Sequence, residues 1–332
     1  MVEWCDNNDI PVHQVDLELF TLRKPWRYLL ARRQTQKLFI DEKIELIHSN
    51  QIWSYRPISS VVKTLRLASV CHLRDPVGAD CHWWLNSNVN VVICISQHIE
   101  QQFLDNNALV NYNEVATVIN PIANTPSLNP EEIISLKNKA RTQFELHKQA
   151  FIIGFIGQII PLKGLPDLIR ALAAVNDDRW QLLVAGVDPR VGGCHVDECK
   201  ELSIKLGVED RIHFLGYLEN ATLFYEAIDL VVVPSIEEPL GRVPLEAAGH
   251  YKPSIVSDAG GLPETVKHNE TGWIVKTDTV GSLTSTVIEA MDADLIEMGV
   301  AARAWKELVA DPTRYMHTLK ELYLTALNTN EI

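Results

Sequence analysis

Two glutamates, Glu238 and Glu246, lie eight residues apart on either side of a glycine and the start of a helix-forming stretch. The apolar run 230–233 before them predicts a buried parallel strand that ends at a proline. If the residues between the two carboxylates were wholly helical, they would span at most about 12 Å. That distance suits one carboxylate on a sugar and another on a ribose, with a diphosphate between them.

The residues that follow the first glutamate predict a place for such a diphosphate. We expect a helix to begin near Gly241, so that the backbone amides of Gly241, Arg242 and Val243 are free. An anion is favoured at such a helix N-terminus by the free N–H groups and by the helix dipole. Two solvated glutamates beside a helix start are the alternative interpretation, because this spacing alone is common by chance. The surrounding sequence favours the first interpretation.

The segment resembles the E-x7-E signature of glycosyltransferase family 4, a group 1 family with the two-domain GT-B fold. Gly157, Gln158 and Lys163 follow a fully apolar predicted strand and resemble the family's Gly-Arg-x4-Lys-Gly segment. Gly260 and Gly261 match its Gly-Gly-x-x-Glu turn, in which glycines let the backbone approach the nucleotide. Gln158 departs from the pattern, because it donates a hydrogen bond where an arginine would add charge. This departure predicts a weaker hold on the diphosphate.

The resemblance implies a retaining glycosyltransferase of the kind used in polysaccharide biosynthesis. It would move a sugar from a nucleoside-diphosphate sugar to a hydroxyl of a glycan, a lipid-linked molecule or a small molecule. Glu238, Lys163 and His72 would act in catalysis. No metal ion or other cofactor would be needed, because Lys163 and the helix N-terminus would stabilise the departing diphosphate. The residues expected to bind the donor are Gly157, Gln158, Lys163, Glu238, Leu240, Gly241, Arg242 and Glu246.

Further cleft candidates follow predicted strands in the first part of the chain. Asn50 ends one such strand, and a second one, 68–72, ends at His72 with Arg74 just beyond it. The family usually places a cleft histidine at this point. Either His72 reaches the acceptor side of the sugar, or Arg74 fills the position. Gly260 and Gly261 are the remaining cleft candidates, and the tryptophans of segment 80–85 form either an acceptor platform or part of the core.

Alternating strand and helix patterns predict an α/β protein with two Rossmann-like, doubly wound parallel sheets that face a cleft. We expect an acceptor-side domain over 1–147, a nucleotide-sugar domain over 148–312, and a C-terminal helix over 313–332 that crosses back. The family's first strand and its Gly-rich turn have no counterpart in the sequence. The N-terminal domain is therefore predicted to be incomplete.

The formal net charge of −13 argues against a nucleic-acid partner, because phosphate neutralisation needs a basic surface. The first residues lack the apolar core of a signal peptide, and no apolar run approaches the ~20 residues that span a bilayer. We therefore expect a cytoplasmic protein. The stretch 21–37 is basic and has an apolar side, so it either lies on an anionic membrane surface or forms a solvated helix face.

Two other functions fit the same residues. A nucleotide-sugar epimerase of the GT-B fold would use the same donor site without an acceptor. An inactive or truncated nucleotide-sugar-binding relic would fit the missing Gly-rich turn and the uncharged Gln158. Incubation with a UDP-sugar and no acceptor separates the first alternative from a transferase, since only the epimerase would produce an epimer.

Overall fold

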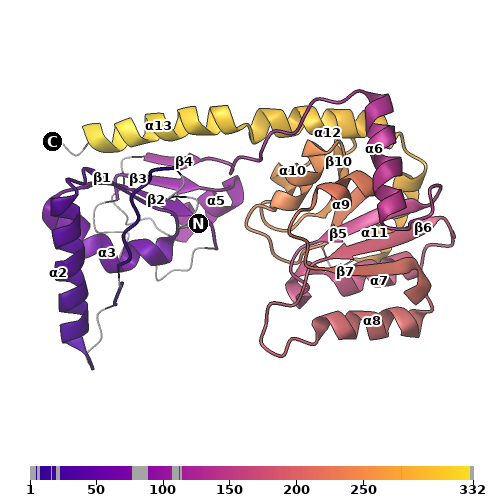
Figure 1. Ribbon diagram of the computed structural model, residues 1–332, viewed down its shortest axis with the longest axis horizontal. Helices are drawn as coiled ribbons and strands as arrows, with labels where there is room; N and C mark the ends of the chain where they lie inside the picture. The colour runs from indigo at the N-terminus through magenta and orange to yellow at the C-terminus, as the bar shows by residue number, and fades with distance from the viewer. Residues whose placement is uncertain are drawn as a thin grey trace. The chain divides into compact units, whose positions relative to one another are not determined.

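The computed structural model describes residues 5, 8–15, 17–19, 23–76, 89–106, 112, 114–277 and 279–329. Within these, the chain forms two compact units, each built on its own sheet (Figure 1). The first unit takes its residues from 1–95, 99–118 and 317–332, and the second takes 96–98 and 119–316. None of the helices in the described part of the chain has the length and apolar character needed to cross a bilayer.

The first unit contains a four-stranded parallel sheet in the order β1-β2-β3-β4. Every residue of β2 and β3 is buried, the pattern of parallel strands covered on both faces. The strands are β1 (Leu46–Ser49), β2 (Ala68–Leu73), β3 (Val91–Cys94) and β4 (Glu114–Thr117), and the helices in this part of the sequence are α2 (Pro25–Asp41), α3 (Ile52–Leu65) and α5 (Gln97–Asn106).

The second unit contains a six-stranded parallel sheet in the order β10-β9-β8-β5-β6-β7. Its strands are β5 (Phe151–Ile156), β6 (Trp180–Ala185), β7 (Ile212–Gly216), β8 (Leu230–Val233), β9 (Ser254–Ser257) and β10 (Gly272–Val275). The helices are α6 (Pro130–Gln143), α7 (Leu165–Ala173), α8 (His195–Leu206), α9 (Thr222–Ala227), α10 (Arg242–Gly249), α11 (Val280–Met291), α12 (Leu295–Val309) and the start of α13 (Pro312–Asn328), with 3-10 turns η2 (Pro161–Lys163), η3 (Glu209–Arg211) and η4 (Leu262–Glu264).

Successive residues of the central strands enter two different hydrophobic cores of the second unit. Ile153 and Val232 pack in the core that α7, α8 and α11 share, whereas Ile152 and Val231 pack in the core of α6, α9 and α10. Because neighbouring strand residues point to opposite faces, both faces of the sheet are covered by helices. This is a doubly wound sheet, as predicted.

The order of the strands in this sheet reverses between β5 and β8, which pair directly. From β5 the chain adds β6 and β7 on one side, and it then returns to add β8, β9 and β10 on the other. In open α/β sheets, ligands bind beyond the carboxyl ends of the strands at such a reversal point. The loops after Ile156 and Val233 therefore frame the candidate site.

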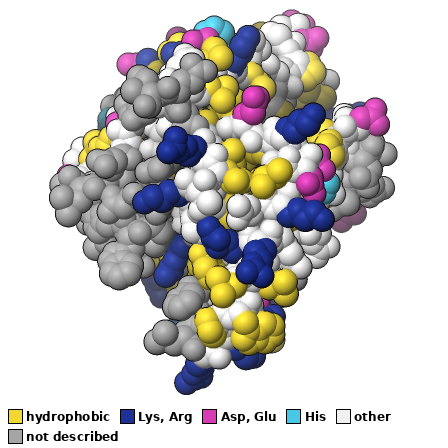
Figure 2. All heavy atoms as spheres, turned by 90° about the vertical axis from the view of Figure 1, so that its left-hand side faces the viewer, with side chains coloured by type: hydrophobic (Ala, Val, Ile, Leu, Met, Phe, Trp, Pro, Cys, Tyr) yellow, Lys and Arg dark blue, Asp and Glu magenta, His cyan; other side chains and the backbone are white. Residues whose placement is uncertain are grey.

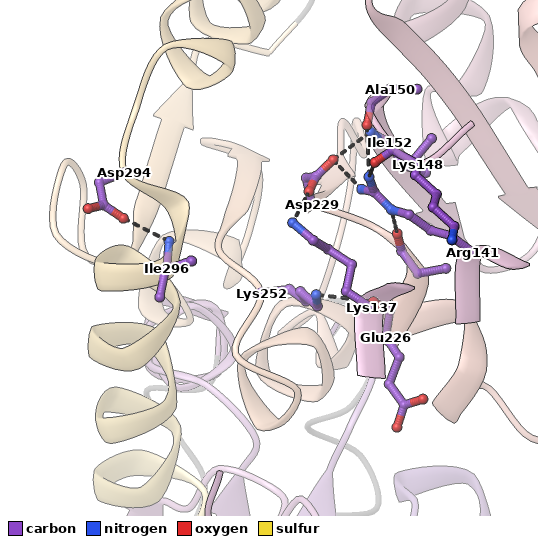
Figure 3. A network of polar contacts seen from close by, with 11 residues as sticks. Lys137, Arg141, Lys148, Ala150, Ile152, Glu226, Asp229, Lys252, Asp294 and Ile296 are labelled. Carbon is purple, nitrogen blue, oxygen red and sulfur yellow. Dashed lines mark hydrogen bonds and ion pairs between the residues drawn. The ribbon is translucent and has the colours of Figure 1, made fainter. Parts of the chain in front are cut away.

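A buried cation holds α6 to the second unit. The side chain of Arg141 is 2% exposed, and its Nη2 lies 2.6 Å from Oδ2 of Asp229 (Figure 3). The same guanidinium donates to the backbone carbonyls of Lys148, Ala150 and Ala227. The donors of the guanidinium are thus turned toward partners on two chain segments, 148–150 and 227–229.

One expectation about the first part of the chain differs from the structure. The domain boundary that we predicted after His147 lies inside the second unit, because α6 is fastened there through Arg141. Residues from His317 onward group with the first unit.

We predict that Arg141→Met lowers the free energy of unfolding of the second unit by about 3–5 kcal/mol, because it leaves a buried carboxylate and three carbonyls without their donor. Urea unfolding followed by the fluorescence of Trp180, which is fully buried in this unit, measures the change. Lys137→Met is the matched control. It removes a more exposed cation from the same Asp229 and should cost less than about 1 kcal/mol. Equal losses for the two variants would contradict the assignment.

Candidate functional site

A cavity of about 350 Å³ opens at the reversal point of the second sheet. Six of the residues predicted from the sequence line it together, from the loop after β5, the loop after β8 and the start of α10. These six are Gly157, Gln158, Lys163, Glu238, Gly241 and Arg242, and the other lining residues are Phe155, Ile156, Val232, Val233, Ser235 and Val243.

An ion pair crosses this cavity. Nζ of Lys163 lies 2.5 Å from Oε2 of Glu238, with the two side chains 27% and 15% exposed. The Ser235 hydroxyl donates to the same carboxylate oxygen over 3.3 Å. Partial burial excludes much of the water that would screen the pair, so the two charges attract each other more strongly than a surface pair does.

The loops that carry the ion pair are packed backbone against backbone. Gly164 ends η2 with a φ of +71°, and a Cβ there would lie 2.0 Å from the carbonyl oxygen of Pro234. The amide of Ile236 donates to the carbonyl of Leu162 over 2.9 Å. Only glycine fits at position 164, and this close approach brings Lys163 next to the loop of Glu238.

The predicted Gly-Gly turn packs against the backbone of Glu238, the acid of the ion pair. A Cβ at Gly260, which has a φ of +57°, would lie 2.0 Å from the carbonyl oxygen of Glu238. The amide of Gly261 donates to that same oxygen over 2.9 Å. The two glycines therefore position the backbone of Glu238 and lie outside the cavity lining.

Glu246, the second of the two glutamates spaced eight residues apart, lies beside the cavity. Oε1 of Glu246 is 3.1 Å from Nε of Arg242, and the Tyr225 hydroxyl donates to Oε2 over 3.0 Å. Arg242 lines the cavity, whereas Glu246 does not. Burial, and then the nearby carboxylate, raise the pKa of Tyr225, so this hydroxyl keeps its proton. The carboxylate of Glu246 is held by two donors one turn into α10.

The N-terminus of α10 borders the cavity, since Gly241, Arg242 and Val243 are among its lining residues. Gly241 is the N-cap, with a φ of +87°, and as a glycine it has no side chain that could cap the helix. Leu240, which we expected to bind the donor, is 2% exposed and packs in the interior. Ser235 and Tyr225 were not among the predicted site residues. A polar residue next to a strand end was a usable signal for Ser235, but nothing in the sequence links Tyr225 to a glutamate 21 positions later.

The remaining candidates lie in the first unit. Asn50 follows β1 and is exposed, and Arg74 follows β2 and is partly exposed. His72 is a fully buried residue of β2, and its ring nitrogens have no hydrogen-bond partner among the described residues. Its ring centroid lies 5.7 Å from that of His48, whose Nδ1 is 2.6 Å from the Tyr323 hydroxyl. The tryptophans of segment 80–85 lie outside the described residues.

The buried His72 is an uncharged histidine at neutral pH. Burial lowers its pKa to about 3, with smaller contributions from Arg74 and His48. Burial, and then Arg74, also lower the pKa of His48. Of the two alternatives left open by the sequence, Arg74 is the residue with access to solvent.

The chain has two α/β units, each with a parallel sheet, and the second carries a charged cavity at the reversal point of its sheet. These features define a Rossmann-like protein of the GT-B class, as predicted. Solved structures share this fold. The chain superposes on Anabaena Alr3699/HepE in complex with UDP and glucose with a TM-score of 0.80 and 22% identity, over 96% of this chain and 88% of that one. A glycosyltransferase from Rickettsia africae ESF-5 gives a TM-score of 0.86 and 19% identity, over 98% and 87%.

The sequence comparisons identify the family. The model of the family "Glycosyl transferases group 1" matches residues 137–305, and the chain belongs to this family. A D-inositol 3-phosphate glycosyltransferase of Mycolicibacterium smegmatis is 34% identical over 160 residues, 48% of this chain and 36% of the relative. An uncharacterized glycosyltransferase of Methanocaldococcus jannaschii is also 34% identical over 160 residues, 47% and 39% of the two chains. The matched segment thus covers well under half of either relative.

We predict that the buried His72 makes the protein less stable in mild acid. The folded pKa of about 3 lies below the unfolded value of 6.5, so the unfolded state binds the extra proton between these values. Stability should fall by about 1 kcal/mol from pH 7 to pH 5.5 through this group.

Urea unfolding of wild type and His72→Leu at both pH values isolates this contribution as a difference of differences. The variant should lose less stability on acidification than wild type. His147→Leu, at an exposed histidine, serves as the control. Parallel pH dependences for wild type and His72→Leu would show that His72 titrates normally.

Proposed function

We propose that the protein is a retaining glycosyltransferase of family 4 that transfers a sugar from a nucleoside-diphosphate sugar to an acceptor hydroxyl. The observation that carries the proposal is the pairing of Lys163 and Glu238 across one cavity, beside the uncapped N-terminus of α10. A cation and free amides suit a diphosphate, and a carboxylate suits sugar hydroxyls. The three groups converge on a volume where the diphosphate and sugar of a nucleotide donor would lie.

The two residues of the ion pair would have different roles, Lys163 toward the diphosphate and Glu238 toward the sugar. When a diphosphate enters, the Lys163 ammonium exchanges the Glu238 carboxylate for phosphate oxygens, which carry more charge. Glu238 is then free to accept hydrogen bonds from sugar hydroxyls, while Ser235 still orients it. As the glycosidic bond breaks, Lys163 and the α10 amides stabilise the negative charge that develops on the departing diphosphate.

The pair of Arg242 and Glu246 would hold the nucleoside end of the donor. Arg242 lines the cavity and is half exposed, so it is able to turn toward a phosphate. Glu246, still bonded by Tyr225, would accept hydrogen bonds from ribose hydroxyls. Gln158 contributes a neutral donor at the same wall. We expect this set to act without a metal ion, since the charges on the diphosphate are met by cationic side chains and backbone amides.

The donor and acceptor are matters for experiment. Alr3699/HepE binds UDP and glucose, which makes UDP-glucose the first donor to test on this chain. A calorimetric comparison of UDP-, GDP- and ADP-sugars would establish the base. The acceptor is a glycan, a lipid-linked molecule or a small molecule, and Asn50 and Arg74 are the residues of the first unit that we propose on its side.

Lys163→Ala should weaken binding of the preferred nucleoside diphosphate and lower kcat/KM at limiting donor. Loss of a charge-assisted contact costs about 1.5–3 kcal/mol, which is roughly a 10- to 150-fold effect. Binding of the free nucleoside should change little, since it has no phosphate for Lys163 to contact. Calorimetry and an assay of nucleotide release measure the two effects.

The matched control is Lys276→Ala, which removes an exposed lysine that lies outside the cavity. It should leave diphosphate affinity and transfer unchanged. If Lys163→Ala bound the diphosphate and transferred sugar as well as wild type, the proposed role of the ion pair would be wrong.

We further propose that α2 rests on an anionic membrane, which would favour a lipid-linked acceptor. Trp26, Leu29, Leu30 and Ile40 are exposed on this helix, at spacings that put them on one face. Exposed basic residues share that part of the surface, and Figure 2 shows Lys and Arg side chains next to hydrophobic ones on this side of the molecule. Apolar side chains that enter the bilayer surface and basic ones that contact anionic headgroups would together hold such a helix on a membrane. The basic residues exposed on or just before α2 are Arg23, Lys24, Arg27, Arg33 and Lys37.

Reversal of two of these charges, in Arg33→Glu/Lys37→Glu, should reduce binding to vesicles that contain phosphatidylglycerol. Each basic residue near such a surface contributes about 1 kcal/mol, so the loss should be at least roughly 30-fold. Vesicle sedimentation at 50 and 300 mM salt measures it, and binding should also weaken with salt. Lys139→Glu/Lys148→Glu makes the same charge change at exposed residues of the second unit and should bind as wild type. Equal binding by both variants would rule out the α2 surface.

A further inference from the structure

The second unit contains another cavity, of about 260 Å³, which shares no residue with the one around Lys163. We name it the linker cavity, because the segment 124–128 between the two sheets forms one wall. α6 supplies Ile133 and Leu136, α9 supplies Glu226, and the turn after α10 supplies His250 and Lys252. Nothing in the proposed transfer reaction uses these residues.

The linker wall is fastened by buried cations of α12. Nη2 of Arg303 donates to the carbonyl of Thr125, and Nη1 to that of Gly249, both over 2.8 Å. Nζ of Lys306 donates to Oδ1 of Asn124 over 2.8 Å. Bonds from buried charged donors fix the linker against the turn after α10. The cavity is therefore part of the folded structure and has a defined shape.

Lys252 is the unusual residue in this wall. It is 4% exposed, and its amine donates a hydrogen bond to the backbone carbonyl of Glu226 over 3.2 Å. In Figure 3 the carboxylate of Glu226 extends away from this amine. The carboxylate of Asp229, the other nearby acid, is already bound by Arg141 and Lys137. Among the described residues, Lys252 thus has no carboxylate in contact with its amine.

Burial is the main reason that the pKa of Lys252 falls to about 7. Asp229 acts against this shift, Lys137 and Arg141 act with it, and Glu226 opposes it least. A buried ammonium with spare N–H donors is costly unless an anion pairs with it. An anionic ligand would supply that partner.

The walls define what kind of anion fits. Pro126, Leu128, Ile133 and Leu136 make one side of the cavity apolar. Burial, followed by nearby cations, lowers the pKa of His250 to about 4, so His250 adds no second positive charge at neutral pH. One ammonium and a nearby carboxylate, that of Glu226, match a single negative charge better than a dianion. The volume is small for a ligand site, so the apolar body is about the size of one ring.

We propose that the linker cavity binds a small monocarboxylic acid with an apolar body, whose carboxylate pairs with the amine of Lys252 and whose body packs against Ile133 and Leu136. Binding requires the charged form of the lysine. The affinity therefore falls about tenfold per pH unit above neutrality, and binding at pH 8.5 takes up a proton.

Titration calorimetry of the full chain with benzoate tests the proposal at pH 6.5 and 8.5. We expect a Kd of about 1 mM or lower at pH 6.5 and binding at least tenfold weaker at pH 8.5. Benzyl alcohol, which has the same ring without the charge, should bind at least tenfold more weakly than benzoate at pH 6.5. UDP should not compete with benzoate.

Three variants separate the parts of the site. Lys252→Met should abolish benzoate binding, and Leu136→Trp should do so by filling the cavity while leaving the amine in place. Lys137→Met removes a cation that lowers the pKa of Lys252, so it should extend benzoate binding to higher pH. Circular dichroism confirms that each variant is folded. Unchanged benzoate binding in Lys252→Met or in Leu136→Trp, or no binding to wild type at pH 6.5, would overturn the proposal.

Discussion

The candidate site depends on one close approach, that of the loop after β5 to the loop after β8. Gly164 lets the two backbones come within contact distance, and the bond from Ile236 to Leu162 fixes their register. Without it, Lys163 and Glu238 would sit on separate loops and each would face solvent. With it, they form a partly buried ion pair in one cavity. The parallel sheet makes this possible, because β5 and β8 are neighbours although 75 residues separate the two charges.

The ion pair also offsets the cost of partly burying the Lys163 ammonium. A partly buried ammonium without a partner would lose hydration and gain nothing in return, which destabilises the fold. Glu238 supplies that partner, and Ser235 keeps the carboxylate aimed at it. The same arrangement leaves both groups usable, since a ligand that brings its own anion and its own hydroxyls replaces each half of the pair. The stability of the site and its proposed affinity for a donor thus depend on the same two residues.

The second sheet was largely predictable because its strands are short apolar runs between turn signals. Leu230–Val233 has the expected bounds, and Gly241 marks the start of α10 as expected. That Lys163 and Glu238 belong to one site was predicted from a resemblance, since spacing in sequence does not report distance across a sheet. The bonds from Tyr225 to Glu246 and from Arg141 to Asp229 were not predictable, because they join elements that meet only through tertiary packing.

Gln158 changes how the site must meet the charge of a diphosphate. At that wall a neutral amide stands where the family pattern has a cation, which leaves Lys163 and Arg242 as the cationic side chains in the cavity lining. Arg242 is bonded to Glu246, and the carboxylate keeps a second donor in Tyr225. Arg242 is therefore able to turn away from Glu246, because the Glu246 carboxylate still accepts a hydrogen bond from Tyr225. We infer that the α10 N-terminus, with its amides and its first arginine, carries more of the diphosphate charge here than the position of Gln158 does.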